Sequence, residues 1–194
     1  MSRPEDIPGI TPVSDLFTYH IFGTPPEARR FQEDPAAYAL TISGLVEPPA
    51  RLSLDDIRSD FEPVTADMVL QCMTNVHWGR IRVTGAKLVD VLERVGVPAG
   101  AVKVAARGAD GFDTNLRLDD IRARPGAFLL AYAMNDAPLP VEHGFPVRLA
   151  SEGKYGYKWP KWLVELKLVD YDYKGHYEGK RGWSDAGTRG RRVT

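Results

Sequence analysis

The spacing of apolar residues changes along this chain, and these changes most constrain the fold. Residues 38–44 alternate apolar and polar side chains with a period of two, as a half-buried strand does. Residues 88–95 instead carry Leu and Val at helical spacing, and Gly96 and Pro98 end that pattern. The chain therefore combines strands and helices in one sequence.

Several other segments have the length and composition of short strands or helix starts. Ser53 stands three residues before Asp56, a spacing typical of a capped helix N-terminus, and residues 119–121 open another short helix. Further strands are predicted over residues 68–72, 101–106, 113–118, 127–134, 147–150 and 162–169. Few helices among many short strands predict an α+β fold with a mixed sheet, and no dinucleotide-binding or P-loop motif occurs.

Composition narrows the possible partners and location. With 194 residues and 43% hydrophobic content, the chain can bury the core of one domain. The 25 basic and 26 acidic residues give a net charge of -1, so we expect no nucleic-acid partner. No apolar run approaches the roughly 18 to 20 residues of a membrane span. Residues 1–10 lack the pattern of an export signal, which leads us to expect a cytoplasmic location.

Cys72 is the only cysteine, and it lies where a predicted buried strand gives way to a polar, glycine-containing turn. A lone thiol forms no disulfide within the chain, so it can be a core residue, a nucleophile, a redox sensor or a single-thiolate metal ligand. One of these alternatives is a thiol enzyme in which His77 acts as the base. The residues alone leave these roles open.

An ordered set of segments around Cys72 resembles a known family. The segments are Cys72, Asp110-Gly111-Phe112, the run from Leu130 to Asn135, the run from His143 to Arg148, and Lys161-Trp162-Leu163. Over residues 34–170 they resemble the molybdopterin-binding domain of the sulfite oxidase family. The resemblance implies a sulfite oxidase-type mixed-sheet domain that binds molybdenum-molybdopterin without an attached nucleotide.

The family resemblance also implies roles for individual residues. Cys72 would ligate the molybdenum, a soft thiolate ligand for a redox metal, and His77 would lie near the reacting centre as a catalytic residue. Arginine and lysine suit the terminal phosphate of the cofactor. The residues implied to bind the cofactor are Tyr19, His20, Thr74, Asn75, His143, Arg148, Lys158 and Lys161.

The chain departs from its sulfite-oxidising relatives at positions that would bind a small dianion. Those relatives carry Asn-Arg-Arg soon after the cysteine, whereas this chain has Asn75-Val76-His77, and no arginine stands near position 18. Both differences remove positive charge from the expected substrate site. They argue against sulfite as the substrate.

The resemblance predicts an oxidoreductase that transfers an oxygen atom to or from a small sulfur- or nitrogen-containing substrate and exchanges electrons with an external protein partner. The alternative is a non-catalytic molybdopterin-binding or interaction protein that has lost the substrate-binding arginines. The predicted organisation is an N-terminal arm (residues 1–33), a cofactor domain (residues 34–178) and a basic tail (residues 179–194). We expect the tail to be solvated and mobile, with packing of Trp183 over the cofactor mouth as the alternative.

Overall fold

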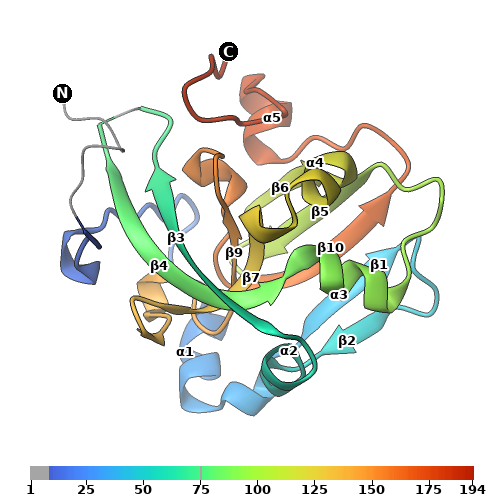
Figure 1. Ribbon diagram of the computed structural model, residues 1–194, viewed down its shortest axis with the longest axis horizontal. Coiled ribbons are helices and arrows are strands. Elements are labelled where there is room, and N and C mark those ends of the chain that lie inside the picture. The colour runs from blue at the N-terminus through green and yellow to red at the C-terminus, as the bar shows by residue number, and fades with distance from the viewer. Residues whose placement is uncertain (1–8, 75) are drawn as a thin grey trace.

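Two five-stranded sheets form the framework of the computed structural model, which describes residues 9–74 and 76–194 (Figure 1). The first sheet has the order β2 (Ala50–Leu52), β1 (Leu40–Gly44), β10 (Leu163–Val169), β5 (Lys103–Gly108) and β6 (Asp113–Arg117). The second has the order β3 (Pro63–Gln71), β4 (Trp78–Lys87), β7 (Phe128–Met134) and β8 (Ala137–Pro138), with β9 (Arg148–Ser151) also paired to β7. Strands β1 and β10 are parallel, and the other pairs are antiparallel. The predicted α+β fold with a mixed sheet is confirmed.

The described part of the chain also contains short helices around the sheets. The α-helices are α1 (Pro26–Glu33), α2 (Leu54–Ser59), α3 (Leu88–Val95), α4 (Leu118–Ala123) and α5 (His176–Arg181). The single-turn 3-10 helices are η2 (Val13–Asp15), η3 (Pro35–Ala37), η4 (Pro125–Ala127), η5 (Val141–His143) and η6 (Gly156–Lys158). In α3 the buried residues follow the predicted helical spacing, and Gly96 ends the helix at a φ of 78°.

The predicted capping sequence at Ser53 forms as expected. The Ser53 hydroxyl accepts a hydrogen bond from the Asp56 backbone N–H at 3.1 Å, and the Asp56 carboxylate accepts one from the Ser53 N–H at 2.8 Å. These two bonds satisfy amide groups that a helix start leaves without partners. They fix the N-terminus of α2.

Strand β4 was not among the predicted strands, because the sequence interpretation placed only a polar turn after Cys72. Its residues alternate between partly buried and buried positions, with Ile81 and Val83 fully buried. Gly85 allows close approach to β7, since a Cβ at this position would lie 2.3 Å from the carbonyl oxygen of Leu130. Glycine and arginine between the apolar residues weaken the strand pattern in the sequence.

The largest core cluster lies between the two sheets and includes Ile42 and Leu166 from the first sheet and Leu130 and Leu149 from the second. A second cluster packs on β3, β4 and β7 and reaches Leu16. Helix α1 falls inside the predicted N-terminal arm, but its Phe31 packs into the largest cluster. Because Phe31 is part of this core, helix α1 belongs to the same domain as the sheets.

The C-terminal segment packs against the domain instead of extending into solvent. Backbone hydrogen bonds join Tyr155 to Gly187 and Arg189 to Gly153 at 2.8 and 2.9 Å. Arg189 also forms an ion pair with Glu152. Backbone and ionic partners thus hold the tail at residues 187 and 189, whereas its basic residues 180–181 and 191–192 are exposed to solvent, as expected.

Among the described helices, none has both the length and the apolar character needed to cross a membrane.

Candidate functional site

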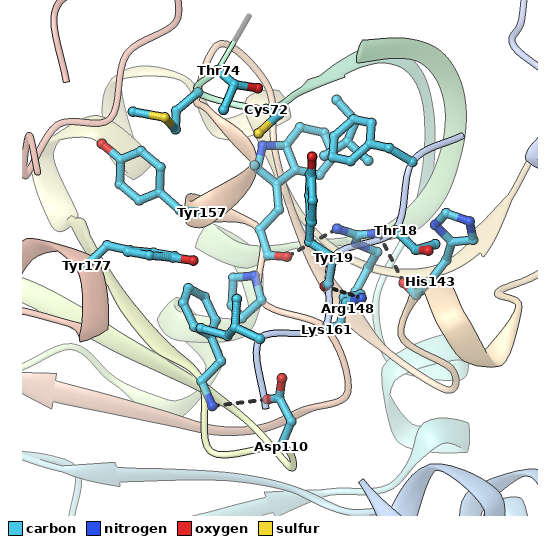
Figure 2. A pocket seen from close by; sticks show the side chains of 18 of the residues that line it. Thr18, Tyr19, Cys72, Thr74, Asp110, His143, Arg148, Tyr157, Lys161 and Tyr177 are labelled. Atoms are coloured by element: carbon cyan, nitrogen blue, oxygen red, sulfur yellow. Dashed lines mark hydrogen bonds between the residues drawn. The ribbon is translucent and has the colours of Figure 1, made fainter. Parts of the chain in front are cut away.

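A cavity of about 350 Å³ lies where the end of β3, the segment before β9, the segment before β10, helix α5 and residues 17–21 meet. Figure 2 shows Tyr157 and Tyr177 on one side and His143, Arg148 and Lys161 on the other, with Cys72 between them at the upper edge. The chemically active side chains of the cavity thus come from segments far apart in the sequence.

Cys72 directly follows β3 and lines the cavity as a partly buried free thiol. Its backbone N–H donates to the carbonyl oxygen of His77 at 2.8 Å, which closes the turn between β3 and β4. The sulfur stands on a short turn that paired strands hold at both ends. A thiol in this position can serve as a ligand at the cavity edge.

Arg148 is the most buried cation of the cavity, with 3% of its surface exposed. Its two terminal nitrogens donate to the carbonyl oxygens of His143 and Trp159, each at 3.1 Å. Among the described residues, its Nε has no hydrogen-bond partner and no carboxylate pairs with the guanidinium. Burial lowers the pKa of Arg148 to about 10, so it remains charged at neutral pH. A buried charge without a counter-ion favours binding of an anion.

Lys161 adds a second cation beside Arg148. Its Nζ donates to the carbonyl oxygens of Tyr19 at 2.9 Å and Glu142 at 3.1 Å, and no described carboxylate forms an ion pair with it. Burial, and then the charge of Arg148, lower the pKa of Lys161 to about 7. An anion in the cavity would reverse part of this effect and keep the lysine protonated.

Gly144 allows these two cations to approach each other closely. It has a φ of 106°, and a Cβ at this position would lie 3.0 Å from Lys161 Cα and 3.1 Å from Arg148 Cβ. A larger residue would therefore strain its own backbone and push the cations apart. The glycine between His143 and the β9 strand is a spatial requirement of the site.

His143 is 4% exposed and lines the same side of the cavity. Burial, followed by the nearby charges of Arg148 and Lys161, lowers the pKa of His143 to about 4. The ring is therefore neutral near pH 7. A neutral imidazole can donate one hydrogen bond and accept another, which suits the edge of a heterocycle.

Tyr19 and Thr74 also line the cavity, whereas His20 and His77 are not among the lining residues. His20 contacts the carbonyl oxygen of Glu142 through Nε2 at 3.2 Å and packs edge-on against Trp162. The His77 ring packs against Phe17 and Tyr19, and the His77 carbonyl oxygen accepts the hydrogen bond from the Cys72 N–H. Asn75 lies outside the described residues.

The prediction that Lys158 binds the cofactor is not supported by its position. Lys158 is fully buried, and its Nζ pairs with the Glu178 carboxylate at 2.5 Å and donates to the Asn115 carbonyl oxygen at 3.0 Å. Its charge is thus neutralised inside the protein, and Lys158 is not among the lining residues, although its Nζ lies 5.5 Å from the ring centre of the lining residue Tyr157. Sequence reasoning could not locate Glu178, which stands 20 residues further along the chain.

The sequence analysis named Asp110 only as part of a family segment and gave it no role in the site, and it missed much of the aromatic lining. Burial raises the pKa of Asp110, whose carboxylate accepts a hydrogen bond from the Phe112 N–H at 3.1 Å. Tyr177 comes from α5 and Tyr157 from η6. The many aromatic residues after position 155 could have indicated an aromatic surface in the site. The sequence did not show which of these residues face the cavity.

The cavity combines a thiol with two cations that form no ion pair among the described residues, and these groups suit an anionic ligand that carries a soft metal. The family model described as the oxidoreductase molybdopterin binding domain matches residues 27–177, so the chain belongs to this family. It is a molybdopterin-dependent oxidoreductase of the sulfite oxidase type, and its cofactor is molybdenum-molybdopterin.

Curated relatives agree with this assignment. The uncharacterized oxidoreductase YuiH of Bacillus subtilis is 34% identical over 150 residues, which cover 76% of this chain and 73% of that protein. The sulfite oxidase of Arabidopsis thaliana is 29% identical, with coverage of 88% of this chain and 50% of the relative. The NADPH nitrate reductase of Mycosarcoma maydis is 28% identical, with coverage of 86% and 20%. The chain thus spans half or less of the last two proteins.

A solved structure shows the same fold. The sulfane dehydrogenase SoxCD from Paracoccus pantotrophus matches with a TM-score of 0.66 and 23% identity, covering 75% of this chain and 41% of that chain. This similarity supports the arrangement of the sheets.

Proposed function

We propose that this protein binds molybdenum through Cys72 and molybdopterin, and transfers an oxygen atom to or from a small sulfur- or nitrogen-containing substrate. The observation that carries the proposal is that one cavity combines the Cys72 thiol with Arg148 and Lys161, two cations that form no ion pair with a carboxylate among the described residues. Membership of the family identifies the cofactor. The cavity contains a thiol that suits the metal end of this cofactor and two cations that suit its phosphate end.

The residues fit the chemistry of this cofactor. Cys72 would provide one soft thiolate ligand at the cavity edge. Arg148 and Lys161 would bind the terminal phosphate, and one phosphate suits this single pair of cations, which supports the nucleotide-free form of the cofactor. The neutral His143 ring would form a hydrogen bond to the pterin edge. Tyr19 and Thr74 would help to close the cavity over the bound group.

When bound, the cofactor supplies two-electron oxygen-atom transfer chemistry. The chain's own residues would hold it, exclude water and position the substrate. Arg148 keeps its charge because its pKa of about 10 lies above neutral pH. Lys161 would gain a proton as the phosphate binds, since its pKa of about 7 in the empty cavity would rise beside an anion. We also propose that an external redox protein exchanges electrons with the site.

The first experiment compares the molybdenum and pterin content of the wild type and Cys72→Ser, both purified from a host that makes the cofactor. We expect near-stoichiometric metal in the wild type and loss of metal or an altered metal spectrum in the variant, because serine removes the soft ligand. Val76→Ala is the matched control, since Val76 is on the same turn, 54% exposed and outside the cavity lining. An unchanged metal content and metal spectrum in Cys72→Ser would rule out the proposed ligand.

A further inference from the structure

Four aromatic side chains form one side of the cavity, which we name the aromatic wall: Phe112, Tyr157, Tyr177 and Trp183. Tyr177 and Trp183 are stacked, with ring centres 4.0 Å apart and an angle of 9° between the rings. Tyr157 meets Trp183 edge-on at 5.1 Å, and Phe112 lies 5.8 Å from Tyr177. These rings belong to a cluster separate from the two main cores, so they are not needed to complete either core.

The aromatic wall is held in place by buried polar contacts behind it. The Tyr157 hydroxyl donates to the Ser184 carbonyl oxygen at 2.7 Å. Glu178 of α5 pairs with Lys158 and accepts a hydrogen bond from the Thr114 hydroxyl at 2.6 Å. These contacts fix both α5 and the segment after it, so the wall is formed before any ligand binds. A preformed surface loses little conformational freedom on binding.

The charges around the cavity restrict what can lie against the aromatic wall. Within the described cavity lining, the strong cations are Arg148 and Lys161, on the side opposite Tyr157 and Tyr177 (Figure 2). An anionic ligand at the wall would lose its hydration without gaining a cation, because Arg148 and Lys161 would already hold the cofactor phosphate. A cationic ligand would also lose its hydration, and Asp110, whose pKa is raised by burial, is the one carboxylate of the described lining that could face it. An uncharged, flat or apolar group avoids both costs and gains ring contacts.

The aromatic wall also lies next to the proposed reaction centre. Met73, which follows Cys72, packs against the same aromatic cluster, and Cys72 and Tyr177 line one cavity. A ligand group bound to the wall would therefore hold its remaining atoms near Cys72.

We propose that the aromatic wall is a substrate subsite that selects uncharged organosulfur compounds carrying an aryl group, such as an aryl sulfoxide or the matching sulfide. This inference rests on the proposed function, because it names the substrate class of the same site. In the direction used for the test, the S–O bond of the sulfoxide breaks and the oxygen leaves as water. Two protons come from solvent, and two molecules of a reduced viologen supply one electron each.

Binding is tested first, without turnover, by calorimetry on the cofactor-loaded protein. We expect methyl phenyl sulfide to bind more tightly than dimethyl sulfide. Tyr177→Leu or Trp183→Leu should weaken binding of the aryl sulfide by about two- to tenfold, the size of one ring–ring contact, while Trp183→Phe should keep most of the affinity. Tyr171→Leu is the matched control, because Tyr171 is 51% exposed and outside the cavity lining.

Kinetics with reduced viologen then separate substrate binding from the chemical step. The KM for methyl phenyl sulfoxide should rise in Tyr177→Leu with little change in kcat, and the KM for dimethyl sulfoxide should stay constant. Equal affinity for aryl and methyl compounds in the wild type would overturn the subsite while leaving the proposed function standing. Loss of molybdenum or pterin from Tyr177→Leu would also overturn it, because the wall would then hold the cofactor. Aryl-selective binding without turnover of any oxide would support the subsite and count against the proposed function.

Discussion

At the scale of single residues, Lys161 shows how a binding site lowers the stability of the empty protein. Unfolded lysine titrates near pH 10.4, whereas burial and Arg148 lower the pKa of Lys161 to about 7. Between these two values the folded protein binds fewer protons than the unfolded chain. The stability of the cofactor-free protein should therefore increase as the pH rises from about 7 towards 10.

Replacing Lys161 should separate stability from cofactor retention. We expect cofactor-free Lys161→Met to melt at a higher temperature than the wild type at pH 6, where the wild type carries the buried charge, and this difference should shrink as the pH approaches 9. Retention of the cofactor should fall by about tenfold or more, because a charge-assisted hydrogen bond is lost. Thermal melts at each pH and pterin content after dialysis measure the two effects. Lys167→Met, at an exposed position of β10, is the control, and a lower melting temperature for Lys161→Met at pH 6 would contradict this account.

At the scale of secondary-structure elements, helices α2 and α5 are both held by polar contacts. The contact in α2 can be predicted from the sequence, whereas the contact that holds α5 cannot. The Ser53 cap of α2 is local and could be predicted from four consecutive residues. The ion pair that anchors α5, between Lys158 and Glu178, joins residues in separate segments. Local chemistry is visible in a sequence, whereas the partner of a buried charge depends on the fold.

The cap of α2 should contribute a modest, separable amount of stability. Ser53→Ala should lower the free energy of unfolding by about 1 kcal/mol, because it leaves the Asp56 N–H without its side-chain acceptor. Urea denaturation measures this loss. Ser59→Ala, at the other end of the helix, should change stability much less, since the Ser59 hydroxyl contacts only the exposed Asp60 carboxylate. Equal losses in the two variants would show that the cap is not the cause.

The buried ion pair behind α5 should be far more sensitive to loss of one partner than to loss of both. Lys158→Met leaves Glu178 charged and buried, and we expect a loss of about 3–5 kcal/mol in the free energy of unfolding. The double variant Lys158→Met with Glu178→Met should recover a large part of that loss, since no unpaired charge remains. Urea denaturation at pH 7 compares the three proteins. A double variant less stable than Lys158→Met would argue against this explanation.

At the scale of the whole molecule, the sequence predicts the parts of the site that depend on neighbouring residues. It does not predict the parts that depend on contacts between residues far apart in the chain. The strand before Cys72 and helix α3 follow from local hydrophobic spacing, and the α+β class follows from their mixture. The run from His143 to Arg148 was found through family resemblance. Tyr177 and Trp183 line the same cavity as Cys72 because of how α5 packs against β6 and η6. No local sequence pattern encodes this packing.

The central place of β10 in the first sheet has a consequence for how the protein acquires its structure during synthesis. β10 lies between β1 and β5, and it pairs residues 41–44 with residues 165–168. In a ribosome-bound chain that has not yet produced β10, the native pairings open to the first sheet are therefore only β1 with β2 and β5 with β6. Contacts between such distant residues slow folding. The sheet, and with it the Lys161 side of the cavity, is completed only when the chain has been made to about residue 169.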